Sequence, residues 1–234
     1  MNSKWFTAIS LAISSTVVTG VASADEKDQA SESKSERSLA PAAHAVELTI
    51  ATGYEQAFGN VASGQPSFTD IAQAGGAVEA SVGYRLMPQL TLGAYGSGGI
   101  FGRGGSVDAS TNLYTATAGA KADWHFLPSA HDLDPWVSLG TGWRGYWLNA
   151  NQGTTSLQGW EIAKLEVGLD YRVDQAAAIG PVVGIDVSTF FTQSTPSSGG
   201  FSNVSNPQAN TFVFAGLQGR FDIPTSGQTQ VASR

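Results

Sequence analysis

Between residues 45 and 223 the chain repeats a pattern in which apolar side chains alternate with polar residues or glycine. The segment AVEASVGYRL (77–86) is a clear example, with its apolar residues at every second position. Successive side chains of a β-strand point to opposite faces, so each segment predicts a strand with one apolar and one polar face. The predicted strands cover residues 45–54, 77–86, 90–97, 114–126, 136–147, 160–173, 179–189 and 211–223. Pro181 lacks the amide hydrogen of a paired strand and predicts a bulge or local break in the seventh.

The polar faces carry full charges, whereas the apolar faces have no charged residue through the middle of the strands. A soluble barrel buries its apolar face, and a membrane barrel does the reverse. Eight strands enclose an interior that side chains can fill, and unpaired buried charges are costly. The inward charges are six cations and seven carboxylates, which predicts a closed, charge-paired lumen network. They are Glu47, Glu79, Arg85, Lys121, Asp123, Arg144, Lys164, Glu166, Asp170, Arg172, Asp186, Arg220 and Asp222.

The predicted connections alternate in length, which is typical of outer-membrane barrels with short periplasmic turns and long outer loops. The long connections are 55–76, 98–113, 148–159 and 190–210, and the shorter ones are 87–89, 127–135 and 174–178. Outward aromatic residues gather near the strand ends, where a bilayer interface favours them. The predicted membrane-interface aromatics are Tyr84, Tyr114, Trp124, Phe126, Trp143, Trp147, Tyr171 and Phe221.

Residues 1–24 have the pattern of a secretory signal peptide, with Lys4 before an apolar stretch and Ala22-Ser23-Ala24 as the cleavage site. A membrane anchor is the alternative, although Ser and Thr dilute the stretch. Residues 25–42 are charged and Ser-rich and predict a disordered periplasmic leader. We therefore expect export through a cleaved signal, a barrel over 43–223 and a tail over 224–234. The expected location is the outer membrane of a Gram-negative-type cell.

The last predicted strand, FVFAGLQGRFDI (212–223), completes a resemblance to small eight-stranded outer-membrane barrels of the OmpA/OmpX type. The resemblance covers residues 45–223 and implies an all-β, eight-stranded antiparallel up-and-down transmembrane β-barrel. It also implies that Gly216, Leu217, Gly219 and Phe221 form a sorting signal for the barrel-assembly machinery. The tail after Phe221 departs from the family pattern, in which the aromatic residue is often the last. Outer-membrane lipid and lipopolysaccharide are the other implied partners.

Little in the sequence favours an enzyme. Of the three histidines, His44 precedes the first strand, His131 falls in a short turn and His125 lies near the end of the fourth strand. Asp123, His125 and Ser138 can be drawn as a triad, but a hydrogen-bonded lumen histidine is the simpler interpretation. The chain has no cysteine and no histidine cluster with metal-ligand spacing, and its net charge of −7 gives no basic footprint for nucleic acid. We expect no enzyme activity, cofactor, metal or nucleic-acid partner.

The four long connections are rich in Gly, Ser, Asn, Gln and Thr, and loops on a rigid scaffold often carry binding. The favoured hypothesis is a closed barrel that acts in envelope integrity or surface interaction, with an extracellular ligand at these loops as a candidate partner. The loop aromatics are predicted either to contact a partner or to fold back onto the rim. They are Phe58, Phe68, Phe101 and Phe201. The alternatives are a narrow pore for small solutes and a soluble, lipocalin-like ligand carrier, which the charged inner face disfavours.

Overall fold

The computed structural model describes residues 43–128 and 132–225. The predicted signal peptide and leader, His131 and the tail from 226 onward lie outside the described residues. Within these described residues, one short helix and nine strands follow one another. They are β1 (Ala45–Phe58), α1 (Phe68–Ile71), β2 (Ala72–Met87), β3 (Leu90–Arg103), β4 (Asn112–His125), β5 (Leu133–Ala150), β6 (Gly153–Arg172), β7 (Ala177–Ser194), β8 (Phe201–Asn203) and β9 (Ala209–Pro224).

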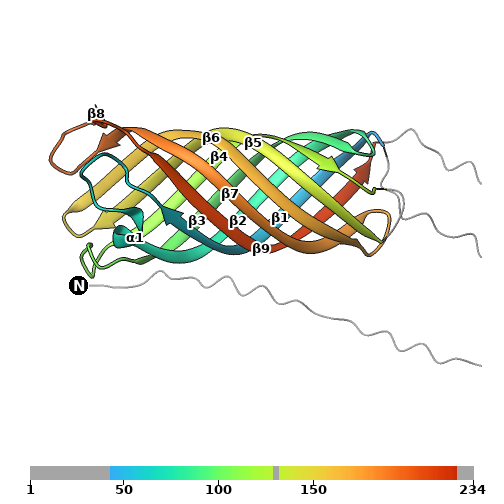
Figure 1. Cartoon of the computed structure of the whole chain (residues 1–234), viewed down its shortest axis with the longest axis horizontal. Coiled ribbons are helices and arrows are strands. Elements are labelled where there is room, and N and C mark those ends of the chain that lie inside the picture. The colour runs from blue at the N-terminus through green and yellow to red at the C-terminus, as the bar shows by residue number, and fades with distance from the viewer. Residues whose placement is uncertain (1–42, 129–131, 226–234) are drawn as a thin grey trace, which may run out of the picture. The chain divides into compact units, whose positions relative to one another are not determined.

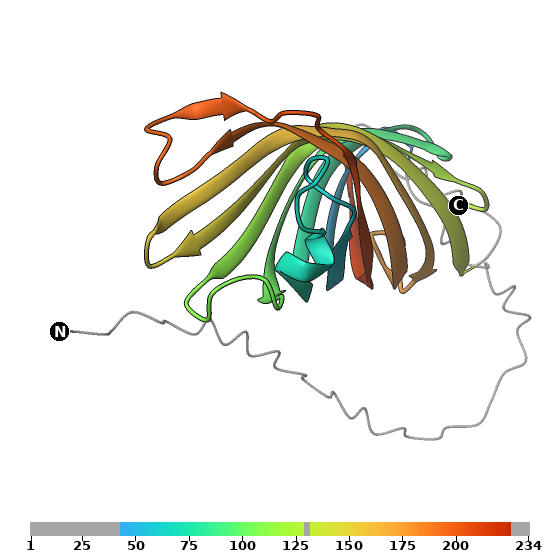
Figure 2. The same ribbon diagram turned by 60° about the vertical axis from the view of Figure 1, so that its left-hand side comes forward.

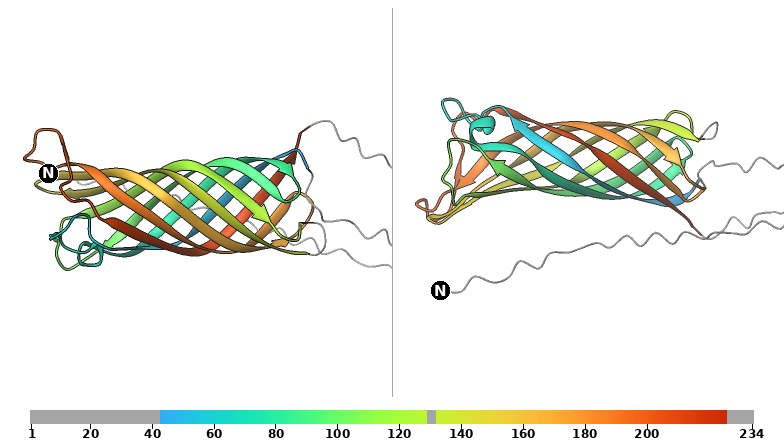
Figure 3. Two further views of the ribbon diagram at one scale, coloured as in Figure 1. Left: turned by 45° about the horizontal axis from the view of Figure 1, so that its top comes forward. Right: turned by 90° about the horizontal axis from the view of Figure 1, so that it is seen from below.

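The strands β1 to β7 and β9 form a closed, antiparallel barrel, in which each strand pairs with the next and β9 returns to β1 (Figures 1 and 3). The closing pair runs along the whole of β1, from Ala45 opposite Pro224 to Phe58 opposite Thr211. The short strand β8 pairs only with the end of β7. The predicted eight-stranded up-and-down barrel is therefore confirmed. Closure matters physically because it leaves no long row of unpaired backbone groups at a sheet edge.

Side chains alternate between the two faces of the wall as the sequence predicts. In β1, Glu47 is 2% exposed, whereas Leu48 and Ile50 on the opposite face are 38% and 56% exposed. In β4, Lys121 and Asp123 are buried, whereas Trp124 is exposed. The polar face therefore lines the interior and the apolar face covers the outside.

The long connections are shorter than predicted because the strands continue beyond the apolar alternation. The predicted loop 148–159 is wrong: β5 ends at Ala150 and β6 begins at Gly153, which leaves a two-residue turn. The other three long connections shrink to 59–71, 104–111 and 195–208; the first of these contains α1 and the last contains β8. Polar segments still pair here, since strands extended from a barrel wall gain backbone hydrogen bonds whatever side chains they carry. Figures 1 and 2 show α1 and β8 at the same end of the barrel, which we call the long-loop end.

Several irregularities interrupt the ladders, and two of them bear on the predicted strands. Pro181 pairs with Leu217 of β9, but pairing with β6 stops between Val182 and Ile179 and resumes in the same register. The proline therefore causes a local break and no bulge. A second irregularity was not predicted: Ile162 is an extra residue in β6 relative to both neighbouring strands. Such a bulge exchanges the inward and outward faces of the strand on one side of it.

Candidate functional site

The polar faces of the strands meet inside the barrel, where all thirteen charged residues that the sequence analysis names are buried. Their exposed fractions lie between 0% for Arg85 and 7% for Glu79. They contact one another in three groups, which follow the barrel from the short-turn end to the long-loop end. An aromatic cluster lies beyond the third group.

Near the short-turn end, two carboxylates hold three guanidinium groups. Glu47 lies 2.5 Å from Arg85 Nη2 and 3.2 Å from Arg220 Nη1. Asp222 lies 3.1 Å from Arg85 Nη2 and 2.9 Å from Arg172 Nη1. These residues come from β1, β2, β6 and β9, so the contacts cross the lumen and tie strands that are not all neighbours. Arginine suits this role because its planar group presents several donors in fixed directions.

Arg220 extends this group toward β4 and β5. Its Nε lies 2.9 Å from Asp170 Oδ2, and its guanidinium lies 5.2 Å from the ring centroid of Trp136. Trp136 donates a hydrogen bond of 3.0 Å to Asp170 Oδ1. Arg220 also donates to His125 Nε2, and the other ring nitrogen of His125 lies 2.7 Å from Asp134 Oδ2. Both nitrogens of His125 are therefore occupied by buried partners.

This geometry does not bring the triad drawn from the sequence together as a nucleophile and base. His125 contacts Asp134 and Arg220. Asp123 and Ser138 are cross-strand partners in β4 and β5, and the Asp123 carboxylate lies 3.9 Å from Lys121 Nζ.

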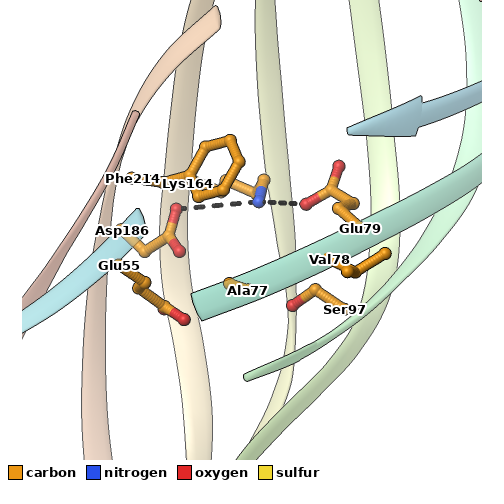
Figure 4. Close-up of a pocket in the computed structure, with 8 residues that line it drawn as sticks. All are labelled: Glu55, Ala77, Val78, Glu79, Ser97, Lys164, Asp186 and Phe214. Carbon is orange, nitrogen blue, oxygen red and sulfur yellow. Dashed lines mark hydrogen bonds and ion pairs between the residues drawn. The ribbon is translucent and has the colours of Figure 1, made fainter. Parts of the chain in front are cut away.

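In the middle of the barrel, two lysines share carboxylates. Lys164 Nζ lies 2.5 Å from Glu79, 3.2 Å from Glu166 and 4.0 Å from Asp186. Lys121 Nζ lies 3.5 Å from Glu79 and 3.8 Å from Glu166. Figure 4 shows Lys164 between Asp186 and Glu79, beside a cavity whose volume of about 10 Å³ suits a single water molecule. The interior here is filled by paired charges.

The third group centres on Arg144 of β5. Its guanidinium lies 2.9 Å from Glu55, 3.0 Å from Glu161 and 2.6 Å from Asp186. It also stacks over the ring of Phe212, with 3.8 Å between the guanidinium carbon and the ring centroid. Asp186 is shared with Lys164, so this group is continuous with the middle one. Phe212 also belongs to the aromatic cluster at the long-loop end, so it connects this group to that cluster.

An aromatic plug fills the lumen at the long-loop end. Phe68, the first residue of α1, is fully buried, with ring centroids 5.2 Å from Tyr146, 5.8 Å from Phe190 and 5.7 Å from Phe212. The helix is fixed at its start by a capping box, in which the Ser67 side chain accepts from the backbone of α1. We call these four rings and the buried apolar residues around them the plug; the latter are Ala57, Val61, Ala62, Ala72, Phe101, Leu113, Leu157 and Val204.

Of the four loop aromatics, Phe68 and Phe101 fold into the barrel and belong to the plug. Phe58 and Phe201 are 43% and 62% exposed. Phe68 and Phe101 therefore fold back, whereas contact of Phe58 and Phe201 with a partner stays a prediction.

Sequence reasoning missed three lumen carboxylates, Glu55, Asp134 and Glu161, which are all buried. Glu55 continues the inward positions of Glu47 and was lost only because the first strand was ended at 54. Asp134 was placed in a turn that the structure shows to be partly strand. Glu161 faces inward because of the bulge at Ile162. Among the described residues the buried charges are ten carboxylates and six cations, so the lumen is more acidic than predicted.

The outside of the barrel carries many exposed large apolar residues, among them Leu139 at 63% and Val183 at 51%. The predicted interface aromatics near the short turns are exposed by 40–56%; they are Tyr84, Trp124, Phe126, Tyr171 and Phe221. Tyr114, Trp143 and Trp147 are partly exposed. Trp160, which the sequence analysis did not select, also faces outward.

Within residues 43–128 and 132–225, no group of three or more His, Cys, Asp or Glu residues is arranged to hold a metal ion. Among the same residues, no helix has the length and apolar character needed to cross a membrane.

Comparison with known proteins gives a match in fold. No protein-family model matches the sequence, and neither does any curated protein. Among solved structures, the outer-membrane protein AlkL in lipid bilayers matches over 88% of this chain and 100% of its own, with 12% identity and a TM-score of 0.51. Neisserial surface protein A matches over 75% of this chain and 96% of its own, with 14% identity and a TM-score of 0.49. The chain therefore has the fold of small eight-stranded outer-membrane β-barrels.

Proposed function

We propose that this protein is an outer-membrane barrel closed to steady ion flow, which acts in envelope integrity or in surface interaction through its outer loops. The observation that carries the proposal is the filled lumen: three groups of buried ion pairs along the barrel, with an aromatic plug beyond them. An ion crossing this lumen would have to displace both the paired charges and the plug. Removing one partner of a buried ion pair costs ~3–5 kcal/mol, and several pairs lie in series.

The outer surface supports a membrane location. A continuous wall of exposed apolar side chains is unfavourable in water, and lipid chains would cover it. The ring-bearing residues near the short turns suit the interface between lipid and water. In this proposal the long-loop end faces outward and contacts lipopolysaccharide. The last strand, β9, presents Leu217 and Phe221 on the lipid side for the assembly machinery.

The same observations favour a scaffold over the other two classes. A soluble ligand carrier needs an apolar interior, whereas this interior is lined by charges. A Ser–His–Asp site would need His125 as its base, whereas Asp134 and Arg220 occupy this ring at the end opposite the loops. We therefore also propose that the protein has no catalytic role.

A narrow pore is the second candidate, and the acidic lumen is the observation that favours it. Ten buried carboxylates against six cations would favour cations over anions along any open path. The selectivity residues would then be Arg85, Lys121, Arg144 and Glu166.

The test is conductance in planar bilayers, with the full-length protein purified from membranes and a heat-modifiable gel shift as proof of folding. A folded protein without steady conductance supports the closed scaffold. Steady, reproducible openings would overturn it, and a preference for cations would then identify the pore.

A further inference from the structure

A second cavity lies at the long-loop end, outside the lumen. Its volume is about 370 Å³, within the ~300–1,000 Å³ range of small-molecule sites. Three segments far apart in the sequence form its walls: residues 61–66 with Ile71, the paired ends of β5 and β6, and residues 204–206 with the end of β7. Its position separates it from the charged network described above.

Backbone pairing holds two of these walls together. Ala62 forms a bridge with Pro207, the amide of Ser63 donates to Asn206 O at 3.2 Å, and the amide of Gln208 donates to Val61 O at 3.1 Å. Asn206 has a φ of 52°, a left-handed conformation that asparagine tolerates better than most residues. A cavity whose walls are joined by the backbone exists before a ligand arrives, and preorganisation lowers the entropic cost of binding.

The floor of the cavity is apolar. Leu157, Val204 and Val61 are buried members of the plug, and each also lines the cavity. A ligand seated here would therefore rest on the outward side of the plug and cover apolar side chains. Burial of this apolar surface makes the main favourable contribution to the free energy of binding.

The rim is polar and uncharged. Gln65, Gln193 and Asn206 bring amide groups to it, and each amide can both donate and accept a hydrogen bond. No charged side chain is among the described residues that line the cavity. A charged ligand would lose water without gaining an opposite charge, so the lining selects against ions of either sign.

We infer that this cavity is a binding site for a small uncharged molecule with an apolar body and hydroxyl or amide groups along one edge. The inference rests on the proposed function, since it names the ligand class for surface interaction at the loops. It also places that ligand on the loop that carries Phe68, although binding needs no movement of the plug.

The experiment uses three probes with one phenyl body: 2-phenylethanol, 2-phenylethylammonium and phenylacetate. Full-length protein in lipid nanodiscs is titrated, and NMR shifts of the methyl groups of Ala62, Leu157 and Val204 are followed. The neutral alcohol should shift these signals saturably, and the two ions should bind at least about tenfold more weakly.

Two tryptophan variants test whether the probe binds in this cavity, and a third variant tests the preference for uncharged ligands. Thr155→Trp fills the cavity and should abolish the saturable shifts of Leu157 and Val204. Thr154→Trp adds the same bulk at the neighbouring position of β6, which does not line the cavity, and should leave them unchanged. Gln193→Glu adds a carboxylate to the rim and should strengthen binding of 2-phenylethylammonium by about tenfold.

Absent shifts, equal binding of the three probes, or equal loss in both tryptophan variants would overturn the inference. Shifts that survive Thr155→Trp would indicate partition into lipid and would overturn it as well. These results are separate from the conductance test. A closed barrel without saturable shifts refutes the cavity alone, and a conducting barrel with them refutes the closed scaffold alone.

Discussion

Replacing Arg144 with methionine should lower the free energy of unfolding by ~3–5 kcal/mol, the usual cost of removing one partner from a buried ion pair. Three carboxylates lie 2.6–3.0 Å from this guanidinium, and all of them are buried. A hydrogen bond to a charged group contributes ~1.5–3 kcal/mol, so three set an upper limit of about 9 kcal/mol. The expected loss of unfolding free energy is smaller than this limit, because the unbranched side chain of methionine can still contact Phe212. Water can also enter the emptied site and bind the carboxylates.

The loss should be recovered in part by removing a carboxylate at the same place. Glu161→Gln in the Arg144→Met background leaves one fewer unpaired charge, so the double variant should be more stable than the sum of the single effects by ~0.5–3 kcal/mol. Arg103 is exposed and serves as a matched control. Its replacement by methionine should change stability by no more than ~0.5 kcal/mol.

The assay is urea unfolding of the protein in lipid vesicles, read by tryptophan fluorescence and by heat-modifiable gel mobility. If Arg144→Met and Arg103→Met behave alike, the lumen contacts do not stabilise the barrel. A strictly additive double variant would show that Arg144 and Glu161 do not interact, which would refute the geometry on which the closed lumen rests.

Three further changes test other layers in the same assay. Phe68→Ala should cost ~3–5 kcal/mol, because it empties the centre of the plug, whereas Phe201→Ala at an exposed site should cost less than ~0.5 kcal/mol. Trp136→Phe should cost ~1–3 kcal/mol, because it leaves the buried Asp170 oxygen without its donor; a loss no larger than that of Phe201→Ala would contradict this. Leu139→Lys on the outer wall should cost ~2–4 kcal/mol in vesicles if that face meets lipid, and a neutral effect would argue against the proposed insertion.

The barrel itself could be predicted from the sequence because strand side chains have a period of two. Once Glu47 is placed inward, the same rule places Leu48 outward, and the opposing strand repeats the test with Arg85 and Tyr84. In every predicted strand except 90–97, which has no charged residue, a wrong phase would put a charge on the lipid side. The cost of that error is large enough that the pattern alone fixes the register of most strands.

The lumen composition could be predicted only in part. The alternation rule holds as far as the ladder is regular, and the bulge at Ile162 breaks it. By alternation from Lys164, Glu161 would face the lipid; the extra residue turns it inward to Arg144 and turns Trp160 and Ile162 outward. A charged residue on a predicted lipid face, between two apolar neighbours, was the available signal for a bulge.

The plug could not be predicted, because its members come from segments whose polarity does not mark them as inward. Phe68 lies in a polar connection, and its burial depends on the turn of α1 that follows Ser67. Capping boxes can be recognised in a sequence, but the direction in which so short a helix points depends on the barrel below it. The ion pairs and the plug thus differ in origin. The two-residue period of the strands directs the charged side chains inward, whereas the plug depends on how one loop packs against the barrel. Loss of Phe68 should accordingly leave the charged groups at the short-turn end in place, since the ion-pair partners of Arg85 and Asp222 among the described residues lie outside the plug.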